Sequence, residues 1–451
     1  MTDDKETKAM SMLVAFRATN VRSFRDSMEF SMEATALAEP EVPREVPWRL
    51  GGRTRVRLLP AAGIFGANAS GKTNLLRAMD DMRRLVQTSF GSGSPRRKRT
   101  RRVHRHSFKL DPNWAETPSK FEIEVIIDGI RHEYGFEVDD YEVLSEHAVN
   151  YPNGRAVTIF SRKGREFHFT ESMDAQANQF KKLTRIDTLF LSVAGALEVP
   201  ELAPLNEWFD NNLDFCAASS REARWNYTAQ MLDDPVLREK VLELIRIADL
   251  GITDITTLKP PPEMLERIQK MVQVFRDEDD ESEVFEIKLD SMVHFEMSHH
   301  ADGNTVALDS GEESLGTLVW FGIVGPVLNA LHDGTVLLVD ELESSLHPSL
   351  VAQLVSIFQS PVSNPNGAQI IFNSHEAKLL GNSAEDRILG RDQAWFAEKS
   401  NDGSTRIYPL TDFAPRKSEA IARRYTEGRY GATPIVSSAE FRNLASEAAT
   451  G

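Results

Sequence analysis

Three short apolar runs stand out in the hydrophobic pattern of the chain, at residues 58–65, 335–339 and 370–372. Runs of this length and composition are typical of strands buried on both faces of a parallel sheet. Residues 74–86 follow the first run and carry apolar side chains at helical spacing, namely Leu75, Leu76, Met79, Met82 and Leu85. The pattern therefore predicts a strand–loop–helix unit early in the chain and two buried strands late in it.

Between these runs the spacing of the apolar residues changes from a period of two, typical of strands, to a period of about 3.6, typical of helices. Apolar residues alternate from Phe121 to Val138 around Asp128-Gly129, which predicts a β-hairpin, and further turn signals extend it into an antiparallel sheet to about residue 170. From about 175 to 275 the spacing is helical. Asp234 and Pro235 open a helix that Gly251 closes, with a stripe of Leu237, Val241, Leu244, Ile245 and Ala248. A second helix is expected from Pro262.

The helical stretch lacks sustained heptads, so we expect a compact lobe and not coiled-coil arms. We divide the chain into an N-terminal lobe with the antiparallel subdomain (12–175), a helical insertion (176–282) and a C-terminal lobe (283–451). The predicted fold class is α/β, with the two ends of the chain joined in one mixed sheet.

The loop between the first strand and helix reads G-x-x-x-x-G-K-T. Its residues are Gly66, Ala67, Asn68, Ala69, Ser70, Gly71, Lys72 and Thr73. In such a P-loop, backbone N–H groups and the helix N-terminus surround phosphates, the lysine reaches the β- and γ-phosphate oxygens, and the Thr hydroxyl binds Mg²⁺. The chain is therefore predicted to bind ATP or GTP.

The second apolar run ends in two acids, Asp340 and Glu341. A buried parallel strand delivers such carboxylates to the carboxyl edge of its sheet. With a P-loop in the same chain, we predict that Asp340 holds Mg²⁺ through water and that Glu341 polarises the attacking water.

Two further features narrow the class of ATPase. The third apolar run is followed by a polar tip, Asn373-Ser374-His375, and Ser344-Ser345-Leu346-His347-Pro348 comes shortly after the two acids. Upstream of Asp340, Ser314 and Gly316 precede a long uncharged segment; Ser310-Gly311 is an alternative register, and a simple N-capped helix is a third reading. This layout resembles ABC-type and SMC ATPases. The resemblance implies that His375 lies beside the γ-phosphate and that Ser314 and Gly316 contact nucleotide held by another subunit.

The whole order of elements resembles the SMC-like ATPases of bacterial anti-phage defence systems, the RloA type and the ATPase of the PARIS system. The opening from Phe16 to Phe24, the hairpin, and the tail segments 391–396 and 429–432 agree with that family, so the resemblance spans about residues 12–436. It implies an ABC/SMC-type ATPase head that forms dimers or larger homo-oligomers with shared ATP sites. It also implies a separately encoded effector of the nuclease or Toprim class.

The cysteine content and the longest uncharged stretch indicate in which cellular compartment the protein is expected. The single cysteine, Cys216, excludes an intramolecular disulfide and favours a reducing cytoplasm. The longest uncharged stretch, 17 residues from Leu315, is shorter than the roughly 20 that a bilayer needs, so we predict a buried helix and no membrane span.

The net charge of −16 opposes unspecific nucleic-acid binding, but the segment from Arg96 to Arg105 concentrates seven cations in ten residues. That segment could bind nucleic-acid phosphates or acidic protein surface such as Asp277–Glu281; we favour protein.

The sequence therefore predicts an ATPase with ATP and Mg²⁺ as cofactors. Three alternatives stay open: the ATP-binding subunit of a membrane transporter, an OLD-like DNA-processing ATPase, and a scaffold in which nucleotide is only structural. The long insertion argues against the transporter, and the short tail after His375, without a D-x-D cluster, argues against a fused nuclease. Glu341 argues for turnover.

Overall fold

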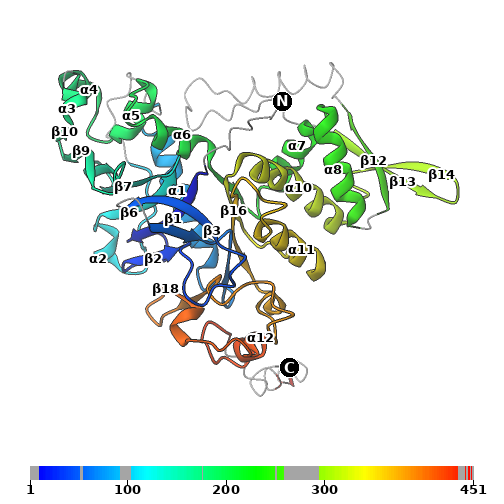
Figure 1. Cartoon of the computed structure of the whole chain (residues 1–451). Coiled ribbons are helices and arrows are strands. Elements are labelled where there is room, and N and C mark those ends of the chain that lie inside the picture. Colours follow the sequence, from blue (N-terminus) through cyan, green and yellow to red (C-terminus); the bar gives the residue numbers. More distant parts are fainter. Residues whose placement is uncertain are drawn as a thin grey trace. The chain divides into compact units, whose positions relative to one another are not determined.

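A computed structural model describes residues 10–50, 54–91, 103–174, 176–248, 251–258 and 294–434, with Arg442, Ala445, Ser446 and Ala448. The chain forms two compact units. We call Ala9–Asp210 together with Ile371–Gly451 the P-loop unit, and Asn211–Ile370 the middle unit. Figure 1 labels their elements. The predicted helix from Pro262, the acidic run at 277–281 and most of the basic segment lie outside the described residues.

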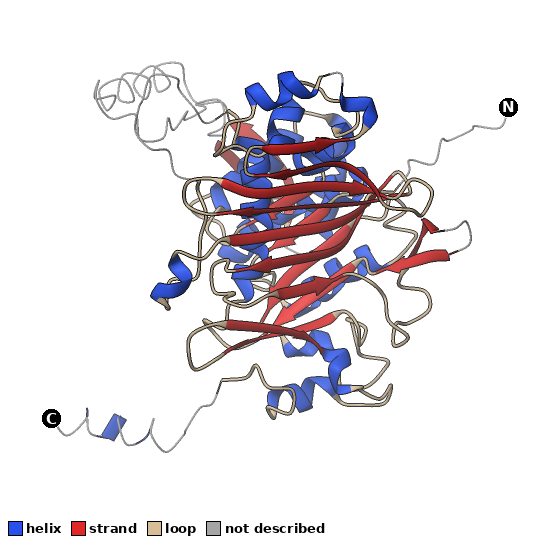
Figure 2. Ribbon diagram, turned by 90° about the vertical axis from the view of Figure 1, so that its left-hand side faces the viewer, coloured by secondary structure: helices blue, strands red, loops and turns tan. Residues whose placement is uncertain are grey.

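The P-loop unit contains a seven-stranded antiparallel sheet, whose long strands run side by side in Figure 2. Its strand order is β10-β9-β8-β7-β6-β1-β2. The strands are β1 (Met12–Thr19), β2 (Met28–Ser31), β6 (Ser119–Ile127), β7 (Ile130–Val138), β8 (Val143–Asn150), β9 (Val157–Lys163) and β10 (Glu166–Phe169). The predicted hairpin is β6–β7, and Asp128 and Gly129 both have positive φ, as its two-residue turn requires.

A second group of strands in this unit carries the P-loop. Its order is β16-β5-β17-β18, with β17 parallel to β5 and β18 antiparallel to β17. The strands are β5 (Ala61–Phe65), β16 (Gln369–Ser374), β17 (Ala394–Lys399) and β18 (Thr405–Pro409). Elements from both ends of the sequence, blue and orange in Figure 1, thus build one unit.

Pro60 corrects the first predicted strand. The apolar run 58–65 is divided, because β4 (Thr54–Leu58) pairs with β3 (Arg44–Leu50) and a new strand, β5, begins at Ala61. Proline has no N–H to donate to a ladder, so it separates the two strands.

The helices of the P-loop unit begin with α1 (Lys72–Thr88), where the predicted residues Leu75, Leu76, Met79, Met82 and Leu85 are buried. The remaining helices are short. They are α2 (Pro112–Ala115), α3 (Glu171–Asp174), α4 (Ala177–Leu183), α5 (Phe190–Ala196), α6 (Ala203–Asn211), which ends at the unit boundary, α12 (Ile421–Thr426), and the 3₁₀ turns η2 (Ala377–Leu380) and η3 (Leu410–Phe413).

The middle unit pairs β11 (Leu213–Cys216) in parallel with β15 (Val336–Val339). It also has an antiparallel sheet of β12 (Ile252–Leu258), β13 (His294–Ala301) and β14 (Asn304–Asp309), and the helices α7 (Arg221–Met231), α8 (Pro235–Ile247), α10 (Leu315–Asp333) and α11 (Pro348–Gln359). The predicted start of α8 is confirmed, since Asp234 Oδ1 accepts hydrogen bonds from the N–H groups of Val236 and Leu237.

The α/β prediction is confirmed, but β11 was not foreseen. Both β11 and β12 lie inside the stretch 176–282 that the sequence predicts to be helical. The four residues of β11 are too few to show a period. The division at residues 175 and 282 stays a prediction, and the two compact units have different boundaries.

Helix α10 is the core helix of the middle unit. A Cβ on Gly322 or Gly325 would come within 2.9 Å of Trp225 or 2.4 Å of Thr228, so these glycines let α10 lie close against α7. In the described part of the chain, α10 is the one helix long and apolar enough to cross a membrane, and 67% of its apolar window is buried in the protein. Burial of this kind is typical of a core helix.

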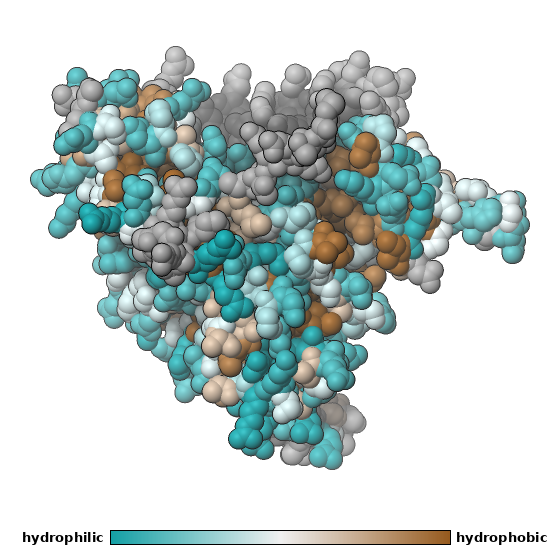
Figure 3. Space-filling view, in the orientation of Figure 1, coloured by the Kyte–Doolittle hydropathy of each residue, from teal (hydrophilic) through white to brown (hydrophobic). Residues whose placement is uncertain are grey.

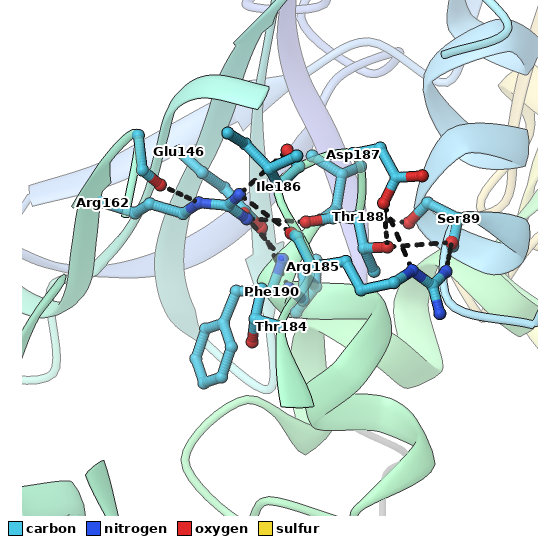
Figure 4. Close-up of polar contacts among 12 residues, drawn as sticks. Ser89, Glu146, Arg162, Thr184, Arg185, Ile186, Asp187, Thr188 and Phe190 are labelled. Carbon is cyan, nitrogen blue, oxygen red and sulfur yellow. Dashed lines mark hydrogen bonds and ion pairs between the residues drawn. The ribbon is translucent and has the colours of Figure 1, made fainter. Parts of the chain in front are cut away.

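A buried ion pair braces the far end of α1 (Figure 4). The Glu146 carboxylate accepts hydrogen bonds from the N–H groups of Phe190 and Leu191, at 2.7 and 2.9 Å, and so caps α5. Arg162 lies 3.4 Å from the same carboxylate and donates to the carbonyl oxygens of the loop before α5, at residues 185, 186 and 188. That loop also contacts Ser89, the residue that ends α1.

Replacing Glu146 should therefore destabilise the protein strongly. In Glu146→Gln, Arg162 keeps its charge in a buried site without a counter-ion, and breaking such a pair costs about 3–5 kcal/mol. Thermal unfolding of this variant should show a clear loss against Glu166→Gln, which changes an exposed carboxylate on β10. Equal melting temperatures would contradict this role for the pair.

Candidate functional site

The P-loop residues form the loop that the sequence predicts, between β5 and α1. Lys72 is the first residue of α1 and is buried, and its Nζ donates to the carbonyl oxygens of Gly66 and Ala67 at 2.8 and 3.0 Å. Ala69 and Gly71 adopt positive φ angles of 60° and 102°. The loop is thus curled around the lysine amine, with its backbone turned by two left-handed residues.

Two glycines of the loop have no room for a side chain. A Cβ on Gly66 would lie 2.3 Å from the carbonyl oxygen of Ala397, and a Cβ on Gly71 would lie 2.2 Å from Thr405 Oγ1. Both distances are far below van der Waals contact. The strand β17 and the start of β18 therefore require glycine at both positions, independently of any ligand.

Ser23 and Thr405 support the loop from behind, and sequence reasoning did not find this role. The Thr405 hydroxyl lies 2.8 Å from both the Ser70 carbonyl oxygen and Ser23 Oγ, which also accepts from the Asn74 side chain. The Thr405 N–H donates to the Ser23 carbonyl oxygen at 2.7 Å. These residues hold the loop in place from segments 382 positions apart.

Arg22 ties the same N-terminal segment to α1. Its guanidinium makes two hydrogen bonds of 2.6 Å with Asp81, and His106 lies 3.3 Å from the same carboxylate. Burial alone would raise the pKa of Asp81, but the hydrogen bonds from His106 and Arg22 outweigh it and lower that pKa. Asp81 is therefore a charged anchor of α1.

The tip of β16 reaches the P-loop. The Asn373 side-chain N–H₂ lies 3.2 Å from Thr73 Oγ1, the hydroxyl predicted to bind Mg²⁺. Ser374 is fully buried, and His375, predicted to contact the γ-phosphate, is the exposed residue that follows. The structure thus places β16, Thr73 and the start of α1 together, and adds Asn373 to the residues found from sequence.

The loop fits a phosphate group by its own chemistry. Within the described part of the chain, the buried Ser70 hydroxyl has no hydrogen-bond partner. Such a group calls for a partner supplied by a ligand. Together with the glycines, the left-handed turn and the lysine amine, it fits phosphate oxygens, and Thr73 is the residue that would hold Mg²⁺.

The predicted acids lie in the middle unit, at the carboxyl end of β15. All four residues of β15 are buried, Asp340 is 5% exposed, and Glu341 is exposed with a positive φ of 54°. Positive φ is uncommon outside glycine and often marks functional residues. Both acids line a pocket that Arg221 and Arg224 of α7 also line.

The signature-like residues occupy the start of α10. Ser314 is the N-cap and accepts a hydrogen bond from the Thr317 N–H at 3.1 Å, while Ser310 lies in the turn after β14. A Cβ on Gly316 would lie 2.8 Å from the Ser345 carbonyl oxygen, so the space there is also restricted. Ser314 has the exposed helix-start position that contact with another chain requires; the contact itself stays a prediction.

The Leu-His-Pro element after the acids is a helix start. Pro348 is the first residue of α11, and His347 Nδ1 accepts from the Ser349 N–H at 3.2 Å. This geometry accounts for the motif as a cap.

A family model described as "AAA domain, putative AbiEii toxin, Type IV TA system" matches residues 61–381, well over half of the chain. The chain belongs to this family. The match includes the P-loop, β15 with its acids, and β16 with His375. It confirms the predicted ATPase-type domain at family level. No curated protein matches this AAA-domain chain.

Solved structures with similar folds include the SMC head domain from Thermotoga maritima, at 11% identity and a TM-score of 0.37, covering 88% of this chain and 98% of that one. Another is the RecF–ATP recombination mediator, at 14% identity and a TM-score of 0.34, covering 90% and 99%. A third is an SMC head bound to the C-terminal winged-helix domain of ScpA, at 9% identity and a TM-score of 0.42, covering 89% and 99%. At such low scores they add nothing to the assignment of residues.

Proposed function

We propose that this AAA-domain protein is an ATPase that binds ATP with Mg²⁺ and hydrolyses it. The geometry of the P-loop carries the proposal. Gly66 and Gly71 are closely confined, Ser70 has an unsatisfied buried hydroxyl within the described residues, and Lys72 lies inside the loop. Since the motif also has the strand and helix that a P-loop needs, triphosphate is the ligand that suits it best.

Each residue has a defined role in this proposal. Lys72 and the loop N–H groups bind phosphate oxygens, and Thr73 and Asp340 hold Mg²⁺, which neutralises phosphate charge when bound. Glu341 accepts a proton from the water that attacks in line, or orients that water. His375 donates a hydrogen bond to the terminal phosphate. Asn373 orients the Thr73 hydroxyl, to which it is hydrogen bonded.

The proposal is tested by phosphate release. Purified protein should release orthophosphate from ATP in the presence of Mg²⁺, and EDTA should stop the release, because charge on the phosphates is then uncompensated. Addition of Mg²⁺ should restore it. Equal release with and without EDTA would contradict the metal-dependent mechanism.

We further propose that ATP brings two copies of the chain together through the start of α10. Hydrophobic surface lies over α8, α10 and α11 in Figure 3. The exposed large apolar residues of these helices include Val236, Ile247 and, next to Ser314, Leu315. Exposed apolar surface of this kind is typical of contact sites. Sedimentation with ATP should show dimers or larger assemblies for the wild type and monomers for Ser314→Arg; identical profiles would refute the interface.

The description of the family names a toxin–antitoxin system, and the sequence resembles anti-phage ATPases. On these grounds we propose a role in a defence system together with a separately encoded effector. Co-purification with the product of the neighbouring reading frame tests this; a chain that restricts phage without any second gene would overturn it. Binding of acidic protein surface by Arg96–Arg105, with nucleic acid as the alternative partner, stays a prediction, as does the cytoplasmic location.

A further inference from the structure

Arg224 has a setting that the roles above do not explain. This residue of α7 is 9% exposed, and its Nε is buried without a hydrogen-bond partner. The described part of the chain supplies no acceptor for this Nε–H group. A guanidinium carries five N–H donors and stays charged at any physiological pH. A buried arginine without an acceptor is unfavourable unless a ligand supplies one.

The surroundings of Arg224 show what kind of ligand this is. The pocket that it lines also contains Arg221 and the two acids, Asp340 and Glu341. Asp340 attracts the Arg224 charge through space. An anion placed beside two carboxylates would be repelled, and the two guanidinium groups offset both negative charges. The pocket can therefore accept an oxyanion next to the acids.

The backbone supports the same conclusion. Strands β11 and β15 are parallel, and α7 begins five residues after β11 ends. Ser220 is the N-cap of α7, so Arg221 and Arg224 belong to its first turns. Ligands of parallel sheets bind at the carboxyl ends of strands, and a helix N-terminus there favours negative charge.

We propose that Arg224, assisted by Arg221, binds a phosphate oxyanion in the pocket beside Asp340 and Glu341. The oxyanion is either the terminal phosphate of ATP or free orthophosphate. Binding of the terminal phosphate of ATP rests on the proposed ATPase function, whereas binding of free orthophosphate does not.

The first experiment uses orthophosphate in a Lys72→Ala background, which removes the P-loop lysine. Millimolar orthophosphate should raise the melting temperature of Lys72→Ala. The shift should disappear when Arg224→Met is added, and should persist with Arg246→Gln, which changes a partly exposed arginine on α8 of the same unit. Arg224→Lys keeps the charge and should keep part of the shift.

The second experiment keeps Lys72 and compares ATP with ADP. If the terminal phosphate is the ligand, Arg224→Met should weaken ATP binding about tenfold, the usual scale for a hydrogen bond to a charged group, and leave ADP binding unchanged. If neither the wild type nor Arg224→Met binds nucleotide, the ATPase proposal fails, while the orthophosphate experiment still decides the role of Arg224.

Loss of the orthophosphate shift, or a selective loss of ATP affinity, supports the proposal. It is overturned if Arg224→Met behaves like Arg246→Gln in both experiments. Packing can be separated from binding, because Met fills a similar volume without charge. A residue that only supports the fold would lower the melting temperature of the ligand-free protein when replaced, whereas removal of a buried unpaired charge should leave it unchanged or higher.

Discussion

Glu341→Gln should bind ATP with nearly the affinity of the wild type and hydrolyse it ~10²-fold more slowly or worse, the usual contribution of a positioned general base. Glutamine keeps the size of the side chain and removes its ability to accept a proton. Glu341 is exposed and held at a positive φ after the buried strand β15, so its replacement leaves the core intact.

The measurement is single-turnover hydrolysis together with equilibrium ATP binding. Glu343→Gln, two residues further on, is the matched control and should keep most of the activity. Wild-type turnover in Glu341→Gln would remove the assignment of this residue as the base.

The second large effect is expected for Gly71→Ala, which should abolish detectable ATP binding. Any residue other than glycine at φ 102° is strained by about 1–2 kcal/mol. At this position the new methyl group would also lie 2.2 Å from Thr405 Oγ1 and 2.8 Å from Ser23 Oγ. The hydroxyls that hold the loop would have to move, and the loop would move with them.

Gly303→Ala provides the control for backbone strain alone. Gly303 has a similar φ of 82°, but a Cβ there would meet no atom within 4 Å. Both variants should lose stability, and Gly71→Ala alone should lose nucleotide. If both variants bind ATP like the wild type, the confinement of the loop does not matter for binding.

Local pattern was enough to predict the elements that carry the P-loop and the acids. The apolar run at residues 335–339 predicts the buried strand β15, and helical spacing predicts the buried face of α1. The start of α8 is predicted by Asp234, whose side chain caps the helix. The apolar run 58–65, by contrast, does not reveal that Pro60 divides it between two strands.

Residues that act through long-range contacts could not be found in this way. Ser23 and Thr405 meet across 382 positions, and Asn373 reaches Thr73 across 300. Arg224 sits on α7, whose buried residues are Arg224, Thr228 and Ala229, so no apolar stripe marks its buried face. Its role also depends on β11, a strand too short to predict. Functional residues that are adjacent in one loop can be recognised from the sequence. Residues that support the loop from distant segments can be recognised only once the fold is known.

The most direct test of ATP binding at the P-loop is a calorimetric titration of ATP·Mg²⁺ into the wild-type chain and into Lys72→Ala. Lys72 lies inside the loop, and its amine donates hydrogen bonds to the carbonyl oxygens of Gly66 and Ala67. Phosphate oxygens of bound ATP would replace these carbonyl oxygens as acceptors. We predict saturable binding to the wild type and a loss of at least about tenfold in affinity for Lys72→Ala, at unchanged melting temperature of the ligand-free protein. Equal affinity of the two proteins for ATP, or no binding by the wild type, would contradict it.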